Sequence, residues 1–247
     1  MVRFFIICLS FFASFKAEAS SIDHTFKLYN ELLGAYVSPG EKEGITVNLV
    51  DYDAWAKDSR HKSAMIQIKK ADPLALKSVE ETIAFWINTY NLLTIDLVIQ
   101  KKESQSIRNL GGLFGNPWDN FKWQIGPKSY TLNDIEHSIL RTLNEPRIHF
   151  ALNCASLSCP DLAPEAYSAE KIYTTLDIKT KNFMNNPTKG MVVTEKSGTS
   201  HVELSQIFKW YRDDFSSIEK FITKYTNVKN IYIDSYIKYN WNLNKRK

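Results

Sequence analysis

The residues best suited to chemistry gather in one short stretch of the chain. Cys154 follows directly on residues 147–153, and a second cysteine, Cys159, lies five positions further on. The small residues between the cysteines predict a tight turn with accessible backbone N–H groups, where a nucleophile and an oxyanion-binding site could sit. A cysteine nucleophile needs a base and a group that orients the base. His149 and Glu136 are the candidates for these roles.

The two cysteines also allow interpretations without catalysis. Once a leader that contains Cys8 is removed, Cys154 and Cys159 are the remaining pair, and an oxidising compartment would favour a disulfide between them. A bridge that closes so short a loop stabilises the folded chain by roughly 2 kcal/mol. Two unreactive thiols are the third alternative. A permanent bridge would exclude the thiol mechanism, so the three interpretations stay open at this point.

Glu136 is predicted to lie on the buried face of a helix over residues 131–143. The apolar residues of this segment recur at helical spacing, and Glu136 falls among them. A carboxylate on a buried face is costly unless it is paired or hydrogen-bonded. Arg108, Arg147 and His149 are the candidate partners. A structural ion pair and a catalytic or binding role are both compatible with this position.

Residues 147–153 are predicted to form a strand, in which side chains alternate between two faces. His149 and Asn153 then share one face, and the small residue between them leaves space, so the pair could line a pocket. They could equally satisfy buried backbone groups. His137, on the flank of the preceding helix, and Arg108 are further candidates for ligand binding.

The expected centre of the core is a long helix from Asp72-Pro73 to about Gln100. It is apolar on nearly all sides, which is typical of a buried helix. Asn88 and Asn91 lie within it, one turn apart, and buried amides must find hydrogen-bond partners. They either position a binding site or tie neighbouring loops to the core. We favour the second role.

The remaining pattern predicts a single, predominantly helical α+β domain around this long helix, with a small, mainly antiparallel sheet. No Pro/Gly/Ser-rich linker or internal repeat divides the chain after its leader. Ser38-Pro39-Gly40 is expected to end the first helix. Further helices are expected over 22–36, 51–70, 168–185, 205–213 and 217–225, hairpins over 121–130 and 191–204, and an aromatic segment over 232–241.

The N-terminus has the pattern of a cleavable signal peptide. Arg3 gives a positive start, residues 4–15 are almost wholly apolar, and Ala17-Glu18-Ala19 is a small-x-small cleavage site. The apolar run is shorter than the ~20 residues that a membrane span needs, and we expect no later stretch long and apolar enough. We therefore expect cleavage after Ala19 and an exported protein, periplasmic or secreted, without a transmembrane segment.

The sequence argues against several other classes of site. His137, His149 and the two cysteines lack the Cys-x-x-Cys or His-x-x-x-His spacing of familiar zinc sites. With no glycine-rich phosphate loop either, we expect neither a metal nor a cofactor. The net charge of +4 is spread along the chain. Nucleic acid is excluded as a partner, because its binding surface would need a basic stripe with interleaved aromatic residues.

A series of short motifs follows in order and at suitable spacing. They are residues 84–91 (Ala-Phe-Trp-Ile-Asn-Thr-Tyr-Asn), 106–111 (Ser-Ile-Arg-Asn-Leu-Gly), 132–137 (Leu-Asn-Asp-Ile-Glu-His), 147–154 (Arg-Ile-His-Phe-Ala-Leu-Asn-Cys), 158–160 (Ser-Cys-Pro), 208–211 (Phe-Lys-Trp-Tyr) and 239–244 (Tyr-Asn-Trp-Asn-Leu-Asn). Together they resemble the family called domain of unknown function 547, over residues 75–245. The resemblance implies a domain common in exported bacterial proteins and also attached to coiled-coil segments in plants. It brings no established reaction and no catalytic residues.

One position departs from the family pattern. The last motif more usually contains Tyr-Asp-Trp, and Asn240 replaces that Asp here, so the resemblance supports no role that requires an acid at this position. The chain is expected to consist of a signal peptide (1–19), a helical segment packed on the domain (20–74) and the family domain (75–245).

Two functions are compatible with these residues. The first is an exported cell-envelope protein that acts as a binding or assembly module, with an envelope protein or a small molecule as its partner. The alternative is a thiol-dependent hydrolase or acyl-transfer enzyme, with Cys154, His149 and Glu136 as nucleophile, base and orienting group. We expect the binding module, because the spacing of these residues does not by itself form a complete catalytic set.

Overall fold

The long helix α4 (Val79–Lys101) is the centre of the fold, as the sequence predicted. The protein is described here by a computed structural model that covers residues 25–112 and 115–246. Every residue of α4 from 83 to 98 is buried. Ser78 begins the helix by accepting the N–H of Glu81, and Lys102 follows its end in the left-handed conformation.

Helix α4 is long and apolar enough to cross a membrane by length and composition alone. The expectation that no stretch after the leader would meet this condition was therefore wrong. However, 89% of its most apolar window is buried inside the domain. The apolar character of α4 serves packing on all its sides, as in the core helix of a globular fold.

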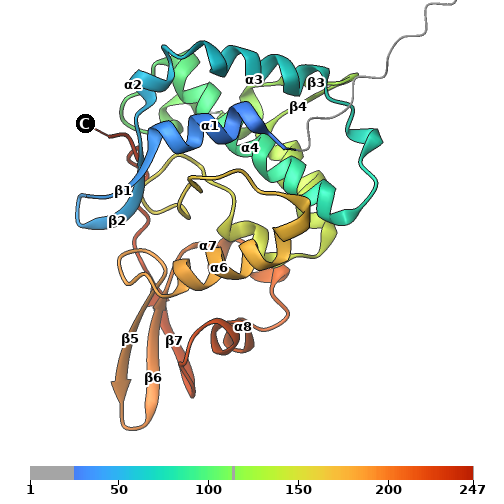
Figure 1. Cartoon of the computed structure of the whole chain (residues 1–247). Helices are drawn as coiled ribbons and strands as arrows, with labels where there is room; N and C mark the ends of the chain where they lie inside the picture. The colour runs from blue at the N-terminus through green and yellow to red at the C-terminus, as the bar shows by residue number, and fades with distance from the viewer. Residues whose placement is uncertain (1–24, 113–114, 247) are drawn as a thin grey trace, which may run out of the picture.

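A layer of helices from the N-terminal segment covers α4 (Figure 1). It consists of α1 (Lys27–Tyr36), α2 (Tyr52–Trp55) and α3 (Ser59–Lys70). Their apolar side chains join the large hydrophobic cluster that surrounds α4. The N-terminal segment therefore shares one core with the family motifs.

Two predicted helix boundaries differ from the structure in this layer. The helix expected over 51–70 is divided into α2 and α3, because the side chain of Asp58 accepts the N–H of Arg60 and starts a new helix. The first helix begins at Lys27; residues 22–24 of the predicted helix, and the predicted signal peptide, lie outside the described residues.

Strands β1 (Val37–Lys42) and β2 (Ile45–Val50) form an antiparallel hairpin that the sequence did not lead us to expect. The first helix ends at Tyr36, before Ser38-Pro39-Gly40 as expected, and these residues continue as a strand. Glu43 and Gly44 both have positive φ (55° and 74°), as a two-residue hairpin turn requires. The C-terminal chain lies along this hairpin: Val50 N–H donates to the Asn244 carbonyl, and Arg246 N–H to the Val50 carbonyl.

A second, smaller hydrophobic cluster lies in the C-terminal half. The three-stranded sheet beside it has the order β5-β6-β7. Strands β5 and β6 are antiparallel, as predicted for the hairpin over 191–204, whereas β7 is parallel to β6 and takes up part of the aromatic segment. Figure 1 shows this sheet and α8 at the end of the molecule opposite α1 and α3. The elements are α6 (Ile172–Met184), β5 (Met191–Lys196), β6 (Thr199–Leu204), α7 (Ile207–Trp210), α8 (Ile218–Tyr225) and β7 (Ile231–Tyr236).

Short elements complete the α+β fold. The hairpin predicted over 121–130 is present as β3 (Trp123–Ile125) and β4 (Lys128–Tyr130). The others are α5 (Pro117–Asn120), a π-helix (Asp134–Leu140) and 3₁₀ helices at Pro73–Ala75, Ile107–Gly111, Arg141–Leu143, Pro146–Phe150, Ala169–Lys171 and Arg212–Asp214. The predicted class, a mainly helical α+β fold around a long buried helix with small, mostly antiparallel sheets, is confirmed.

The strand predicted over 147–153 is wrong. The structure has a 3₁₀ helix at Pro146–Phe150 instead, begun by Glu145, whose side chain accepts the N–H of Arg147. A proline at the first helical position after a capping residue favours a helix start. This signal outweighed the alternation of side chains, so His149 and Asn153 do not share the face of a strand.

Asn88 and Asn91 tie neighbouring loops to α4, as we expected. The side chain of Asn91 accepts the N–H of Asn153 at 2.8 Å and donates to the Ala151 carbonyl at 3.0 Å. Asn88 makes the same pair of bonds with the backbone of Tyr167, at 2.9 and 2.8 Å. Asn91 therefore fixes the chain immediately before Cys154.

Replacing Asn91 with Ala should lower the free energy of unfolding by about 2–4 kcal/mol, since it leaves two buried backbone groups without partners. Urea unfolding followed by circular dichroism measures this change. The exposed Asn227 provides the control, and Asn227→Ala should change stability by less than about 0.5 kcal/mol. A loss below about 1 kcal/mol for Asn91→Ala would show that the clamp is unimportant.

Candidate functional site

A cavity of about 680 Å³ brings together most of the residues singled out in the sequence. Its wall includes Glu136, His137, His149 and both cysteines, together with Arg108. Asn88, Asn91 and Asn153 are not among the lining residues. Their side chains bind backbone groups of neighbouring loops instead. The other lining residues are Tyr90, Gly112, Gly115, Asn116, Pro117, Trp118, Asn133, Leu152, Pro160, Ile207, Trp210, Tyr211, Tyr239 and Trp241.

Glu136 reaches the cavity from the π-helix Asp134–Leu140. The start of this segment is fixed by a reciprocal pair of bonds, in which Thr131 and Asp134 each accept the N–H of the other. Glu136 itself is buried, so its carboxylate must have partners. A single π-helical turn inside a helix frequently marks a functional position.

The partners predicted for Glu136 were wrong. Its two carboxylate oxygens accept hydrogen bonds from two phenols, Tyr211 at 2.5 Å and Tyr90 at 3.1 Å. Burial raises the pKa of both phenols, and the charge of Glu136 raises it further, so both hydroxyls remain donors. Arg147 instead contacts Glu145 and Asp177. No charge pattern in the sequence indicates a carboxylate held by tyrosines.

His149 is oriented by Asp214, a residue that sequence reasoning missed. The His149 Nε2 atom lies 2.6 Å from Asp214 Oδ2, and the ring of Tyr211 stacks on the imidazole at a centroid distance of 4.0 Å. Asp214 also accepts two bonds from the guanidinium of Arg141, at 2.7 and 2.6 Å. Burial raises the pKa of Asp214, but the bonds from His149 and Arg141 outweigh burial and lower it, so the group is a carboxylate at neutral pH.

The second ring nitrogen of His149 faces the cavity. Nδ1 has no hydrogen-bond partner among the described residues, and it is not one of their fully buried, unpartnered polar atoms. When Nε2–H donates to Asp214, Nδ1 carries the free lone pair. An imidazole fixed in this way can take up or release a proton at the cavity wall.

Cys154 is half-buried at the same cavity. Its Sγ atom lies 3.0 Å from Ser156 Oγ and 3.3 Å from the Tyr239 hydroxyl, and its N–H donates to Cys159 Sγ. Burial raises the pKa of Cys154, but hydrogen bonds from Cys159, Ser156 and Tyr239 outweigh it and lower the pKa to about 7. Burial and the neighbouring Cys154 sulfur raise the pKa of Cys159. Both sulfurs are free, not bridged, in this structure.

Most backbone N–H groups of the turn are already bonded, although that of Ser156 donates to the Cys154 sulfur. The N–H of Ala155 donates to the Asn153 side chain, and those of residues 157 and 158 donate to the carbonyls of Asn242 and Asn240. The hydroxyl groups of Ser156 and Tyr239 are further donors near Sγ. Burial, and then the charge of the cysteines, raise the pKa of Tyr239, so its hydroxyl keeps its proton.

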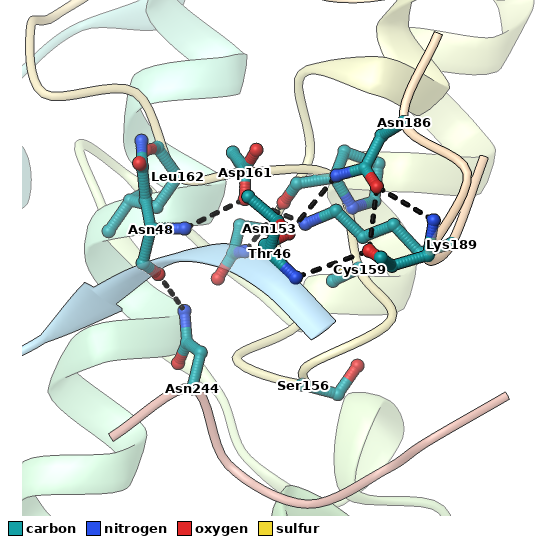
Figure 2. Close-up of polar contacts among 12 residues, drawn as sticks. Thr46, Asn48, Asn153, Ser156, Cys159, Asp161, Leu162, Asn186, Lys189 and Asn244 are labelled. Carbon is teal, nitrogen blue, oxygen red and sulfur yellow. Dashed lines mark hydrogen bonds and ion pairs between the residues drawn. The ribbon is translucent and has the colours of Figure 1, made fainter. Parts of the chain in front are cut away.

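Polar contacts hold the loop of Cys159 from behind, as Figure 2 shows. Asp161 accepts from the N–H of Asn48 on β2 at 2.9 Å and from Lys189 Nζ at 2.7 Å. The Lys189 side chain is completely buried, whereas that of Asp161 is 35% exposed, so the pair lies at the edge of the core. Asn153 donates to the Pro160 carbonyl at 2.7 Å. Asn153 is thus a structural residue of the loop.

The family departure at Asn240 has a local explanation. The Asn240 side chain donates to Glu43 in the turn of the β1–β2 hairpin at 2.8 Å, and Asn242 donates to the same carboxylate. These bonds lower the pKa of Glu43. An Asp at position 240 would place a second carboxylate against Glu43, so the amide suits this hairpin.

The three residues of the predicted catalytic set share the cavity but not a hydrogen-bond chain. Within the described ranges, no hydrogen bond joins Cys154, His149 and Glu136 to one another. Asp214 takes the orienting position that we assigned to Glu136. Glu136 is connected to His149 only indirectly. It accepts a hydrogen bond from the hydroxyl of Tyr211, and the Tyr211 ring stacks on His149. His137 contacts Arg141 at 2.7 Å on the same wall.

Among the residues that the structure describes, no group of His, Cys, Asp and Glu could hold a metal ion. No curated protein and no solved structure matches the chain. One family model does match, and its description is "Protein of unknown function, DUF547". The match stops before the last two motifs of the sequence, which nevertheless contribute Trp210, Tyr211, Tyr239 and Trp241 to the same cavity. Residues 74–184 of the chain match the model of this family.

Proposed function

We propose that this domain is a thiol-dependent acyl-transfer enzyme or hydrolase, in which Cys154 is the nucleophile and His149 moves the proton. The observation that carries the proposal is the shared cavity: Cys154 and His149 both line it, and Asp214 holds the His149 ring by a hydrogen bond. A nucleophile, a base and a group that orients the base are the parts that covalent acyl transfer requires.

The reaction begins when Cys154 Sγ attacks the carbonyl carbon of an acyl compound. An S–C bond forms, the bond to the leaving group breaks, and His149 passes the thiol proton to the leaving group. Water or another nucleophile then adds to the thioester, the S–C bond breaks, and the thiol recovers its proton. The Tyr239 hydroxyl, 3.3 Å from Sγ, is positioned to donate to the carbonyl oxygen as negative charge develops there.

The surroundings of His149 favour this role over a purely structural one. Asp214 sets the tautomer that leaves Nδ1 free, as a carboxylate does when it orients a histidine base. Arg141 and Tyr211 fix the carboxylate and the ring in turn. Such a rigid arrangement around a half-exposed thiol is typical of a preorganised site.

A second function, a binding or assembly module, is favoured by a different observation. Among the described residues, the Cys154 sulfur bonds to Ser156 and Tyr239 and makes no bond to His149. In this second proposal the aromatic cavity holds a small molecule or a segment of an envelope protein, and the polar residues maintain its shape. The variants below distinguish the two.

We also propose that the protein is exported and acts in the periplasm or outside the cell. The support is the N-terminal pattern of a positive residue, an apolar run and Ala17-Glu18-Ala19. An oxidising compartment would then act on Cys154 and Cys159, and their free state is a condition of the thiol mechanism.

Incubation with acyl thioesters and p-nitrophenyl esters should give an acyl adduct on Cys154, detected by intact mass. Cys154→Ser should abolish the adduct, and His149→Ala should lower kcat/KM by about 10²–10⁴-fold because proton transfer is lost. His201 is the matched control: it pairs with Asp234 at 2.9 Å and does not line the cavity.

His201→Ala should leave the rate within about twofold, as expected for a site away from the chemistry. Equal rates for folded His149→Ala and wild-type protein would contradict the role of His149. If no compound in the panel acylates wild-type Cys154, the binding module is the better account.

Alkylation of Cys154 by iodoacetamide should reach half its maximal rate near pH 7, because burial is outweighed by hydrogen bonds that lower the thiol pKa to about 7. An ordinary cysteine would give a midpoint at about 8.5. Tyr239→Phe should raise the midpoint by up to about one pH unit, since a bond to the thiolate is lost. Tyr232→Phe, exposed on β7, is the control. A wild-type midpoint near 8.5 would refute the activated thiol.

Mass spectrometry of protein recovered outside the cytoplasm should show a chain that begins at Ser20. Ala19→Arg should block this processing, because the cleavage site needs a small residue there. Recovery of full-length protein that begins at Met1, confined to the cytoplasm, would overturn the proposal of export.

A further inference from the structure

Arg108 lines the cavity, and its guanidinium group pairs with no carboxylate in the described part of the chain. It lies on the 3₁₀ helix Ile107–Gly111, whose start is fixed by Ser106, which accepts the N–H of Arg108. The guanidinium lies over the ring of Trp241, 5.2 Å from its centroid. In the described ranges it makes no ion pair and no side-chain hydrogen bond, and the residue is exposed. A planar cation held against an aromatic face keeps its donors directed at solvent.

The charges around the cavity leave Arg108 as its available cation. It is the only lysine or arginine among the described lining residues. Glu136, the lining carboxylate, already accepts from two phenols. Asp214 is bound to Arg141 and His149. The inner groups are therefore satisfied among themselves, and the Arg108 charge is not neutralised by any of them.

An aromatic path connects Arg108 with the reactive sulfur. The Trp241 ring lies 4.5 Å from that of Tyr239, and the Tyr239 hydroxyl lies 3.3 Å from Cys154 Sγ. Trp210 stacks on Trp241 at 5.6 Å. A ligand between these rings could reach both the guanidinium and the sulfur.

We propose that the acyl compounds that enter this cavity carry a carboxylate, which binds to Arg108 while the reacting carbonyl group lies at Cys154. This inference rests on the proposed acyl-transfer function. Guanidinium and carboxylate match as planar, two-point partners. One guanidinium balances a single negative charge, whereas a phosphate dianion would keep about half of its charge uncompensated. The chemistry of the cavity therefore favours a monocarboxylate.

Two alkylating reagents that differ in charge test this directly. Iodoacetate and iodoacetamide both form an S–C bond at Cys154 with loss of iodide, but only iodoacetate carries a carboxylate. The rate ratio of iodoacetate to iodoacetamide should fall about fivefold in Arg108→Ala, because the attraction of one charge is lost. Arg108→Lys should keep the ratio within about twofold of wild type, since the positive charge remains.

Lys229→Ala is the matched control, because it removes one positive charge from an exposed position that does not line the cavity. It should not change the ratio. An unchanged ratio in folded Arg108→Ala, with Cys154 still reactive, would overturn the inference while leaving acyl transfer intact. Loss of the acyl adduct together with a normal, Arg108-dependent ratio would overturn acyl transfer and keep the anion site. If wild-type Cys154 reacts with neither reagent, both proposals fail.

Competition identifies the anion. Phenylacetate should protect Cys154 from iodoacetamide in the wild-type protein, and this protection should be at least about fivefold weaker in Arg108→Ala. Phenylacetamide, which has the same ring without the charge, should protect both proteins equally. Stronger protection by inorganic phosphate than by phenylacetate would contradict the choice of a carboxylate.

Discussion

The contact between Asp214 and His149 joins the two halves of the molecule. Asp214 lies in the C-terminal half, beside Phe215 of the smaller hydrophobic cluster, whereas His149 lies between Ile148 of the large cluster and Phe150 of the small one. The Asp214 carboxylate also binds Arg141, the residue that follows the π-helix containing Glu136. The cavity forms where the two clusters meet, so its geometry depends on this part-buried hydrogen bond. Arg141 holds the Asp214 carboxylate in place with two further bonds.

The site stabilises its charges with hydroxyl groups more than with cations. Two phenols hold Glu136, and a phenol and a serine lie beside the Cys154 sulfur. Because the phenol pKa values are raised by burial, these hydroxyls remain donors whenever the carboxylate and the thiolate are charged. The arrangement satisfies charge inside the cavity without adding positive charge there. Arg108 at the cavity wall is thus free to act on a ligand.

The sequence predicted the parts of the fold that depend on local pattern. The long buried helix, the hairpins around 126 and 198, the amide ties of Asn88 and Asn91 and the family followed from periodicity, turn residues and motifs. Partners distant in sequence could not be predicted: Asp214 is 65 residues from His149, and Tyr211 is 75 from Glu136. The sequence failed to predict the β1–β2 hairpin and wrongly predicted a strand over 147–153. Both errors lie at prolines, which are compatible with more than one local structure. Pro39, predicted only to help end the first helix, lies in a strand, and Pro146 begins a helix.

The thiol mechanism requires that Cys154 and Cys159 exist as thiols where the protein acts. The direct measurement is to alkylate the protein as recovered from the cell, after denaturation without reductant, and to identify the modified peptides by mass. We expect an alkyl group on both Cys154 and Cys159. A peptide in which the two cysteines resist alkylation until a reductant is added would reveal a disulfide, and would contradict the thiol mechanism at its first step.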